Sequence, residues 1–340
     1  MAVLKAFISI YRKIVLKYHS CRLLHLLNHR MIKLMREHES ITDRSIDMSL
    51  NESGNNNRYG LVMEGGAMRG LFTCGVIDAF MENGIDFDGA VGTSAGATFG
   101  CNIKSRQIGR ALRYNKRFCN DKRYAGFGSL IRTGNLFNEE FCYHDIPFIY
   151  DLWDEKAFQE NPMEFYAVST DVETGKPVYY KLNKGDAADI RWIEASASMP
   201  LLAKIVNIDG RRLLDGGIGD SIAVRFMQKT GYNKNIVILT QPRGFVKKPN
   251  PMMPAIRAKY HKYPAFIRAA ENRHIRYNDT LRYIEEQEAL GNVYAVRPPK
   301  TLDIGKMERN PDELQRVYDI GHDTALSCID EIKGLGFCKP

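Results

Sequence analysis

Short, uniformly apolar runs alternate with a helical pattern between residues 60 and 97. Residues 60–63 form a strand of the buried type, and a second apolar strand ends at Val91. Between them, apolar residues recur at helical spacing from Leu71 to Phe80, and Asn83 and Gly84 provide the stop signal. Strand, helix and strand in this order make a βαβ unit. The pattern therefore predicts a parallel sheet whose loops gather at the carboxyl ends of its strands.

Hairpin patterns and further helices follow along the chain. Residues 164–182 alternate around Thr174 and Gly175, and residues 205–214 alternate around an Asp209-Gly210 turn, so each segment is expected to form a hairpin. The expected elements after these are a helix over 191–198, a buried strand over 235–240, a helical stretch over 254–290, a strand over 293–296 and a helix over 311–333.

Shifts in composition divide the chain into three parts. Residues 1–57 are a basic helical leader followed by a polar linker, and residues 58–245 carry the alternating strands and helices. Residues 246–340 begin with a proline-rich and lysine-rich break and form an α-rich C-terminal appendage. The sequence thus predicts an α/β domain with an extension at each end.

The leader carries the whole excess of positive charge. Residues 1–36 hold eight Lys and Arg and no acidic residue, which leaves 40 basic and 40 acidic residues in the rest of the chain. Leu4, Phe7, Ile8 and Tyr11 recur at helical spacing with cations on the opposite side. A basic amphipathic helix of this kind suits an anionic membrane surface, and an apolar stripe that docks on the protein's own body is the alternative.

Composition also restricts the function classes. The near-neutral body argues against nucleic-acid binding, and no apolar run reaches the length of a membrane span. Seven scattered cysteines show no metal-ligand spacing and fit reduced thiols in a cytoplasm. We therefore expect a cytoplasmic protein, either free or peripheral on the inner face of the membrane, and neither a metal nor a cofactor.

The strand that ends at Val91 runs into Gly92-Thr93-Ser94-Ala95-Gly96, a G-x-S-x-G arrangement. Such a turn places the serine hydroxyl at a helix N-terminus, where backbone amides and the helix dipole favour an approaching anion. Gly92 and Gly96 leave room for the tight turn. Ser94 is therefore a candidate nucleophile, although an ordinary helix start with a Gly-rich cap produces the same pattern.

A glycine loop follows the first strand and is expected at the same sheet edge as Ser94. An exposed serine needs a base for its proton and donors for the oxyanion that forms on the attacked carbonyl. The backbone amides of Gly65, Gly66 and Ala67 are candidates for those donors. Arg69, in the next turn, is placed to hold the loop or to contact a substrate phosphate.

Asp215 is the candidate base. It ends an apolar strand and precedes Gly216 and Gly217, which let the backbone come close to its neighbours. A turn aspartate is the plainer reading of Asp-Gly-Gly. Histidine is the other residue type that takes a serine proton, but none of the histidines outside the leader has a distinctive context: His144, His261, His274 and His322.

Together these segments resemble the patatin-like phospholipase family. The matching pieces occur in the family's order over about residues 58–245, and they are the glycine loop 65–70, the elbow 92–96, the run 195–200 and the Asp-Gly-Gly at 215–217. The C-terminal stretch resembles the tail of a bacterial subgroup of these proteins. The resemblance implies a three-layer α/β sandwich with a mostly parallel central sheet.

The same resemblance implies a serine hydrolase of lipid acyl esters, of the phospholipase A or lysophospholipase type, with a Ser-Asp dyad. Ser94 would be the nucleophile, Asp215 the general base, and the amides of Gly65, Gly66 and Ala67 the oxyanion hole. Arg69, Gly92, Gly96, Gly216 and Gly217 would support them. One departure from the family is Ala67, where the family usually has glycine. Alanine resists a positive φ, so this residue puts the conformation of the loop in doubt.

Three other readings of the sequence differ from this one. An α/β-hydrolase esterase shares G-x-S-x-G but uses a Ser-Asp-His triad and places its elbow after more strands. A dinucleotide-binding domain fits the glycine loop, but its G-x-G-x-x-G fingerprint fails at Ala67. A membrane-surface binding protein with an idle hydrolase body is the third, and the intact Ser94 and Asp215 argue against it.

Overall fold

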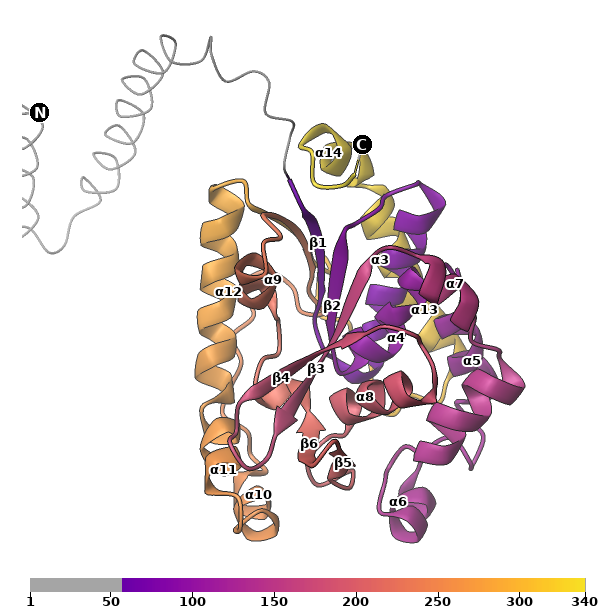
Figure 1. Cartoon of the computed structure of the whole chain (residues 1–340), viewed down its shortest axis with the longest axis vertical. Coiled ribbons are helices and arrows are strands. Elements are labelled where there is room, and N and C mark those ends of the chain that lie inside the picture. The colour runs from indigo at the N-terminus through magenta and orange to yellow at the C-terminus, as the bar shows by residue number, and fades with distance from the viewer. Residues whose placement is uncertain (1–56, 340) are drawn as a thin grey trace, which may run out of the picture. The chain divides into compact units, whose positions relative to one another are not determined.

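One mixed sheet of eight strands organises residues 57–339, the part of the chain that this computed structural model describes. The strands lie in the order β5-β6-β3-β2-β1-β7-β8, and β4 pairs with β3 off this path (Figure 1). Their bounds are β1 Tyr59–Met63, β2 Gly89–Thr93, β3 Glu164–Asp171, β4 Pro177–Leu182, β5 Val206–Ile208, β6 Arg211–Asp215, β7 Lys234–Ile238 and β8 Val293–Val296.

The centre of the sheet is parallel and one flank is antiparallel. Strands β3, β2, β1, β7 and β8 are neighbours that run in one direction. Strands β4 and β6 pair antiparallel with β3, and β5 pairs antiparallel with β6. The expected parallel sheet and both expected hairpins are therefore confirmed. The second hairpin turns at Asp209 and Gly210, both with positive φ (49° and 74°), as a two-residue Asp-Gly turn requires.

Helices surround the sheet. Those described begin at residue 67, and they are η1 Ala67–Arg69, α3 Gly70–Glu82, α4 Ala95–Lys104, α5 Arg110–Phe118, α6 Phe127–Thr133, η2 Phe141–Tyr150, α7 Glu155–Glu160, α8 Ala187–Ala197, η3 Gly216–Ile218, α9 Val224–Lys229, α10 Met253–Lys259, α11 Pro264–Glu271, α12 Arg273–Ala289, α13 Pro311–Leu326 and α14 Ile329–Gly334. The helical stretch expected over 254–290 consists of three helices, α10, α11 and α12. Pro264, which has no amide hydrogen to donate, begins the second of them.

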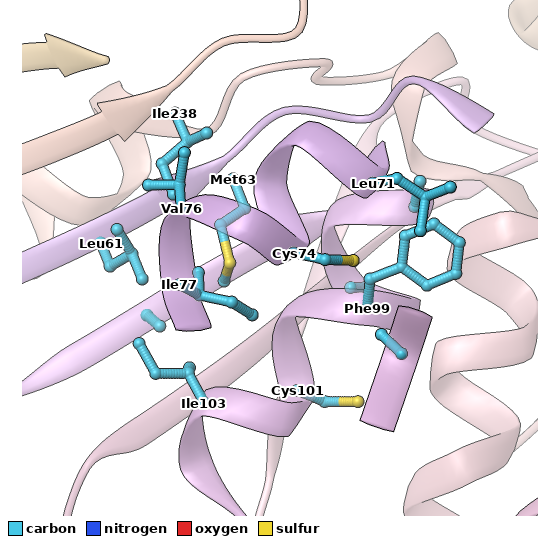
Figure 2. Packing of buried hydrophobic residues seen from close by; sticks show 14 of the residues in the cluster. Leu61, Met63, Leu71, Cys74, Val76, Ile77, Phe99, Cys101, Ile103 and Ile238 are labelled. Atoms are coloured by element: carbon cyan, nitrogen blue, oxygen red, sulfur yellow. The ribbon is translucent and has the colours of Figure 1, made fainter. Parts of the chain in front are cut away.

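Both faces of the sheet are covered, which makes the fold a three-layer α/β sandwich. Successive side chains of a strand point to opposite faces. Leu61 and Met63 of β1 belong to the cluster formed with α3 and α4, whereas Val62 belongs to the cluster formed with α9 and α12. Figure 1 shows α9 and α12 on one side of the sheet and α3, α4 and α13 on the other. Figure 2 shows Leu61 and Met63 beside Ile77 of α3, and Leu71 of α3 beside Phe99 of α4.

The C-terminal residues contribute to both the sheet and its covering layer. Strand β8 extends the sheet beside β7, and α13 packs along α3. The boundary expected at residue 245 stays a prediction, as does the division into three parts. The basic leader 1–36 lies outside the described residues. Among the described helices, none is both long enough and apolar enough to cross a membrane.

Helices α3 and α13 approach closely at two glycines. A Cβ on Gly321 would stand 2.0 Å from the carbonyl oxygen of Phe72, and one on Gly75 would stand 2.1 Å from that of Tyr318. We expect Gly321→Ala to lower the free energy of unfolding by about 2 kcal/mol or more, because the helices must separate to admit the methyl group. Gly334→Ala is the matched control, since nothing lies within 4 Å of its Cβ position. Equal urea midpoints for the two variants would contradict this close contact.

Candidate active site

Ser94 stands at the junction of β2 and α4 in a strained conformation, with φ 56° and ψ −121°. A residue other than glycine rarely adopts a positive φ, and such strain is common where a side chain is presented for chemistry. The two neighbouring glycines permit the turn. A Cβ on Gly92 would stand 2.2 Å from the Gly96 carbonyl oxygen, and one on Gly96 would stand 2.3 Å from the Met63 carbonyl oxygen. A side chain at Gly92 would disrupt the turn itself, and one at Gly96 would push the elbow away from β1.

The pairing of β3 brings Asp215 to Ser94. The last residue of β2, Thr93, pairs with Val168, and the next residue of β3, Ser169, pairs with Asp215 of β6. Strand β4 occupies the other edge of β3, so β2 and β6 follow one another along a single edge. As a result the Ser94 Oγ donates a hydrogen bond of 2.6 Å to Asp215 Oδ2.

The groups around Asp215 shift the pKa of its carboxyl group in opposite directions. Burial raises the pKa of Asp215, while the hydrogen bond from Ser94, the nearby charge of Arg273 and the amide of Gly217 oppose that rise. The Gly217 amide donates to Oδ1 over 2.7 Å, so both carboxylate oxygens have a donor. This arrangement fixes the direction in which Oδ2 faces the serine.

The glycine loop lies beside the serine. A Cβ on Gly65 would stand 2.9 Å from the Ser94 Cβ, so only glycine fits there. Ala67 has φ 49°. The loop therefore adopts the positive φ at this position even though the residue is alanine and not glycine. Among residues 57–339, no acceptor is found for the amides of Gly65, Gly66 and Ala67. These amides are free to donate to a bound anion.

Two family models match parts of this chain. Residues 61–227 match the family model described as patatin-like phospholipase. Residues 61–227 are a patatin-like phospholipase domain. A second family model, described only as a domain of unknown function, matches residues 263–335.

Two related sequences and one solved structure illustrate the likeness. The uncharacterized protein YjjU of Escherichia coli is 27% identical over 273 residues, which are 78% of this chain and 75% of that protein. Lysophospholipase nte1 of Aspergillus terreus is 25% identical over 309 residues, which are 82% of this chain but only 18% of the fungal protein. Among solved structures, VipD from Legionella pneumophila has a TM-score of 0.43 and 13% identity, and the match covers 81% of this chain and 67% of VipD.

The patatin-like domain has an apolar pocket at Ser94. Its lining includes Ala67 and Ser94, and the apolar and aromatic remainder is mainly Met68, Phe99, Tyr114, Tyr124, Phe137, Tyr143, Met199 and Leu202. Glu139 and Glu194 also line it, and burial, reinforced by the charge of Glu139, raises the pKa of Glu194 to about 7. A long acyl chain is the type of ligand that such a lining suits.

The described histidines of this patatin-like protein lie elsewhere. His322 faces Glu82 at 2.8 Å, and His261 and His274 each face a backbone carbonyl oxygen of their own turn. His144 lies at the surface with Glu140 and Asp145, and these three offer ligand atoms within 4.8 Å of one another, as exposed acidic groups often do. No histidine among residues 57–339 hydrogen-bonds to Ser94 or Asp215. The contact that the serine makes is with the carboxylate.

Sequence reasoning gave no role to two serines that hold the site. The Ser94 amide donates to Ser196 Oγ at 2.9 Å, and that hydroxyl donates to the Val168 carbonyl oxygen at 2.6 Å. The Asp215 amide donates to the Ser198 carbonyl oxygen at 2.8 Å. The run 195–200 thus ties the elbow to the strand of the aspartate. The sequence signal for this role was the run of small residues at the end of α8. The family resemblance included this run but gave it no function.

Proposed function

We propose that this protein is a serine hydrolase of lipid acyl esters, with Ser94 as nucleophile and Asp215 as general base. The observation that carries the proposal is the 2.6 Å hydrogen bond from Ser94 Oγ to Asp215 Oδ2, made by a serine that lines an apolar pocket. A carboxylate in that position accepts the proton of the hydroxyl as the oxygen attacks. No histidine is needed for this step.

The reaction follows from the same atoms. Ser94 Oγ bonds to the acyl carbonyl carbon while its proton passes to Asp215 Oδ2, and the carbonyl oxygen becomes an anion. The amides of Gly65, Gly66 and Ala67 stabilise that anion. The tetrahedral intermediate then expels the alcohol, which takes the proton from Asp215 and leaves an acyl group on the serine. Water, deprotonated by Asp215, releases the fatty acid in a second and equivalent cycle.

The substrate class is supported by the pocket and by the relatives. The mostly apolar lining suits a fatty acyl chain, and the named relatives include lysophospholipases. A panel of phospholipids, lysophospholipids, glycerides and p-nitrophenyl esters, with released fatty acid measured, tests this directly. Hydrolysis of long acyl esters supports the proposal, whereas no release from any member of the panel contradicts it.

We further propose that the leader 1–36 holds the enzyme on anionic membranes. Its eight cations without any acid favour such a surface, at about 1 kcal/mol for each Lys or Arg near the bilayer. Deleting residues 1–36 should reduce sedimentation with anionic vesicles and the hydrolysis of vesicle lipids, and should spare a soluble short-chain ester. Binding of the full chain should weaken as salt rises, since salt screens these charges. Equal sedimentation of both proteins would instead favour a leader that packs on its own body.

A further inference from the structure

Four basic side chains gather beside the proposed dyad, and three come from outside residues 61–227. Arg69 follows the glycine loop, whereas Lys247, Arg273 and Lys306 come later in the chain. The charges of Arg273 and Lys306 both act on Asp215, and those of Arg69, Arg273 and Lys306 all act on Lys247. Residues 263–335, matched only as a domain of unknown function, thus supply two cations to this place.

Arg273 lies directly against the Asp-Gly-Gly turn. Its Nε donates to the Gly217 carbonyl oxygen. Its Nη2 lies 3.0 Å from the position that a Cβ on Gly217 would occupy, and Asp215 Oδ1 lies 2.9 Å from the same point. The absence of a side chain at Gly217 therefore lets the guanidinium approach the catalytic carboxylate. The group is anchored through Nε, and Nη2 lies beside Gly217.

Lys247 is held in place by α12. Its amide donates to Asn278 Oδ1 at 2.8 Å, its carbonyl oxygen accepts from Asn278 Nδ2 at 3.0 Å, and its Nζ lies 4.0 Å from the centre of the Tyr277 ring. Burial and the charges of Arg273, Arg69 and Lys306 together lower the pKa of Lys247 to about 8, and the charge of Glu64 opposes them. The ammonium group is thus fixed in a region of positive potential.

The nearby carboxylates are already engaged. Glu64 accepts from the Thr240 amide at 2.6 Å and from the Tyr277 hydroxyl at 2.5 Å, and Asp215 accepts from Ser94 and Gly217. Within residues 57–339, none of the four cations has a carboxylate oxygen within the 4.0 Å of an ion pair. The Nε of Arg69 is buried and has no hydrogen-bond partner there. Positive charge is in excess, and donors remain to be satisfied.

One hollow is lined by Ser94, and a second is lined by the Asp-Gly-Gly turn at Gly217. Ser94 lines the apolar pocket, and Gly217 lines a second hollow together with Arg273 and Tyr277. The two hollows share no lining residue. The acyl chain of an ester attacked by Ser94 fits the apolar pocket, which leaves its alcohol part on the side of Arg273. Arg69 and Lys247 line neither hollow.

We propose that Arg69, Lys247 and Arg273 bind the phosphate group carried by the alcohol part of a phospholipid or lysophospholipid substrate. This inference rests on the proposed acyl hydrolase function. It adds that the alcohol released by the enzyme carries a phosphate group. Arginine and lysine are the side chains that bind phosphate through charge-assisted hydrogen bonds. Lys306, which is exposed, adds its positive charge to theirs. The C-terminal segment of unknown function is thereby part of the substrate site.

The test compares a lysophospholipid with a monoacylglycerol of the same acyl chain, both in the same neutral detergent micelles. Wild type should hydrolyse the lysophospholipid at least about tenfold more efficiently, because only this lipid offers a phosphate to the charge-assisted hydrogen bonds. Lys247→Met keeps the apolar stem over Tyr277 but removes the charge, so the ratio of the two kcat/KM values should fall about tenfold, mainly through KM. Lys248→Met, at the exposed neighbouring lysine, should leave the ratio unchanged.

Proton binding and direct ligand binding give two further readouts. In wild type the ratio should decline as pH rises through about 8, where Lys247 loses its charge, and in Lys247→Met it should not. Glycerol 3-phosphate should raise the Tm of Ser94→Ala, glycerol should not, and adding Lys247→Met should remove the shift. Two results together would assign the site to free phosphate and overturn the lipid proposal. Inorganic phosphate would raise the Tm as much as glycerol 3-phosphate does, and the wild-type enzyme would hydrolyse the two lipids equally well.

The possible outcomes distinguish the proposed phosphate site from the proposed acyl hydrolase activity. Hydrolysis of both lipids with a ratio near one in wild type and in Lys247→Met would overturn the phosphate site and leave the acyl hydrolase standing. Hydrolysis of neither lipid would overturn the acyl hydrolase. In that case the shift in Tm still decides whether the cluster binds phosphate.

Discussion

Ser94→Ala should abolish ester hydrolysis and labelling by fluorophosphonate probes while the protein stays folded. The substitution removes the Oγ that is proposed to bond to the acyl carbon, and loss of a covalent nucleophile costs several powers of ten in rate. Alanine also retains the backbone amide that donates to Ser196 Oγ, so the elbow keeps that support. The measurements are probe labelling on a gel and kcat/KM on a p-nitrophenyl ester.

A serine at the other end of the same helix provides the control. Ser94 precedes α4 and Ser105 follows it, and the Ser105 hydroxyl donates only to the Asn102 carbonyl oxygen. Ser105→Ala should therefore label and hydrolyse as wild type does. Activity near wild type in a folded Ser94→Ala protein would end the proposal of a serine nucleophile.

Asp215→Asn should lower kcat by about a thousandfold or more, with little change in fold. Asparagine has nearly the same shape, but it does not accept a proton from the attacking hydroxyl, and general base catalysis typically contributes 10²–10⁴ in rate. Asp209→Asn, at the exposed tip of the second hairpin, is the matched control, since asparagine tolerates its positive φ. Equal rates for the two variants would show that Asp215 is not the base.

The pH profile tests the same residue without mutation. Only the ionised carboxylate accepts a proton, so activity should be lost as pH falls through the pKa of Asp215. Burial raises that pKa, and the loss should therefore begin at a higher pH than for an exposed aspartate, whose pKa is about 3.9. If replacing one histidine instead abolishes activity in a folded protein, a triad accounts for the chemistry and the dyad does not.

The elements with strong local signals were predictable. The βαβ unit, both hairpins and the strand 293–296 follow from apolar runs, a helical period and Gly-containing turns, and the structure has them within about two residues of the expected bounds. The elbow and the glycine loop were predictable for a similar reason. Their chemistry depends on backbone conformation, and glycine marks such conformations in a sequence.

Contacts between distant segments were not predictable in this way. Nothing local in the sequence says that Ser169 pairs with Asp215, because register is fixed by the assembled sheet. Arg273 lies 56 residues beyond the glycine whose carbonyl oxygen it contacts. Residues 141–150 form a π-helix that contains Pro147, which helical periodicity does not indicate. In each case tertiary contacts, rather than the local pattern, decide the outcome.

The shared edge of β3 also orders events during synthesis of the chain. Ser94 and Asp215 are 121 residues apart, and the aspartate reaches the serine only after β6 has paired beyond the end of β2. A ribosome therefore completes the elbow and the glycine loop long before it adds the residue proposed to activate the serine. If the dyad is the catalyst, the growing chain is chemically silent toward lipids throughout that interval.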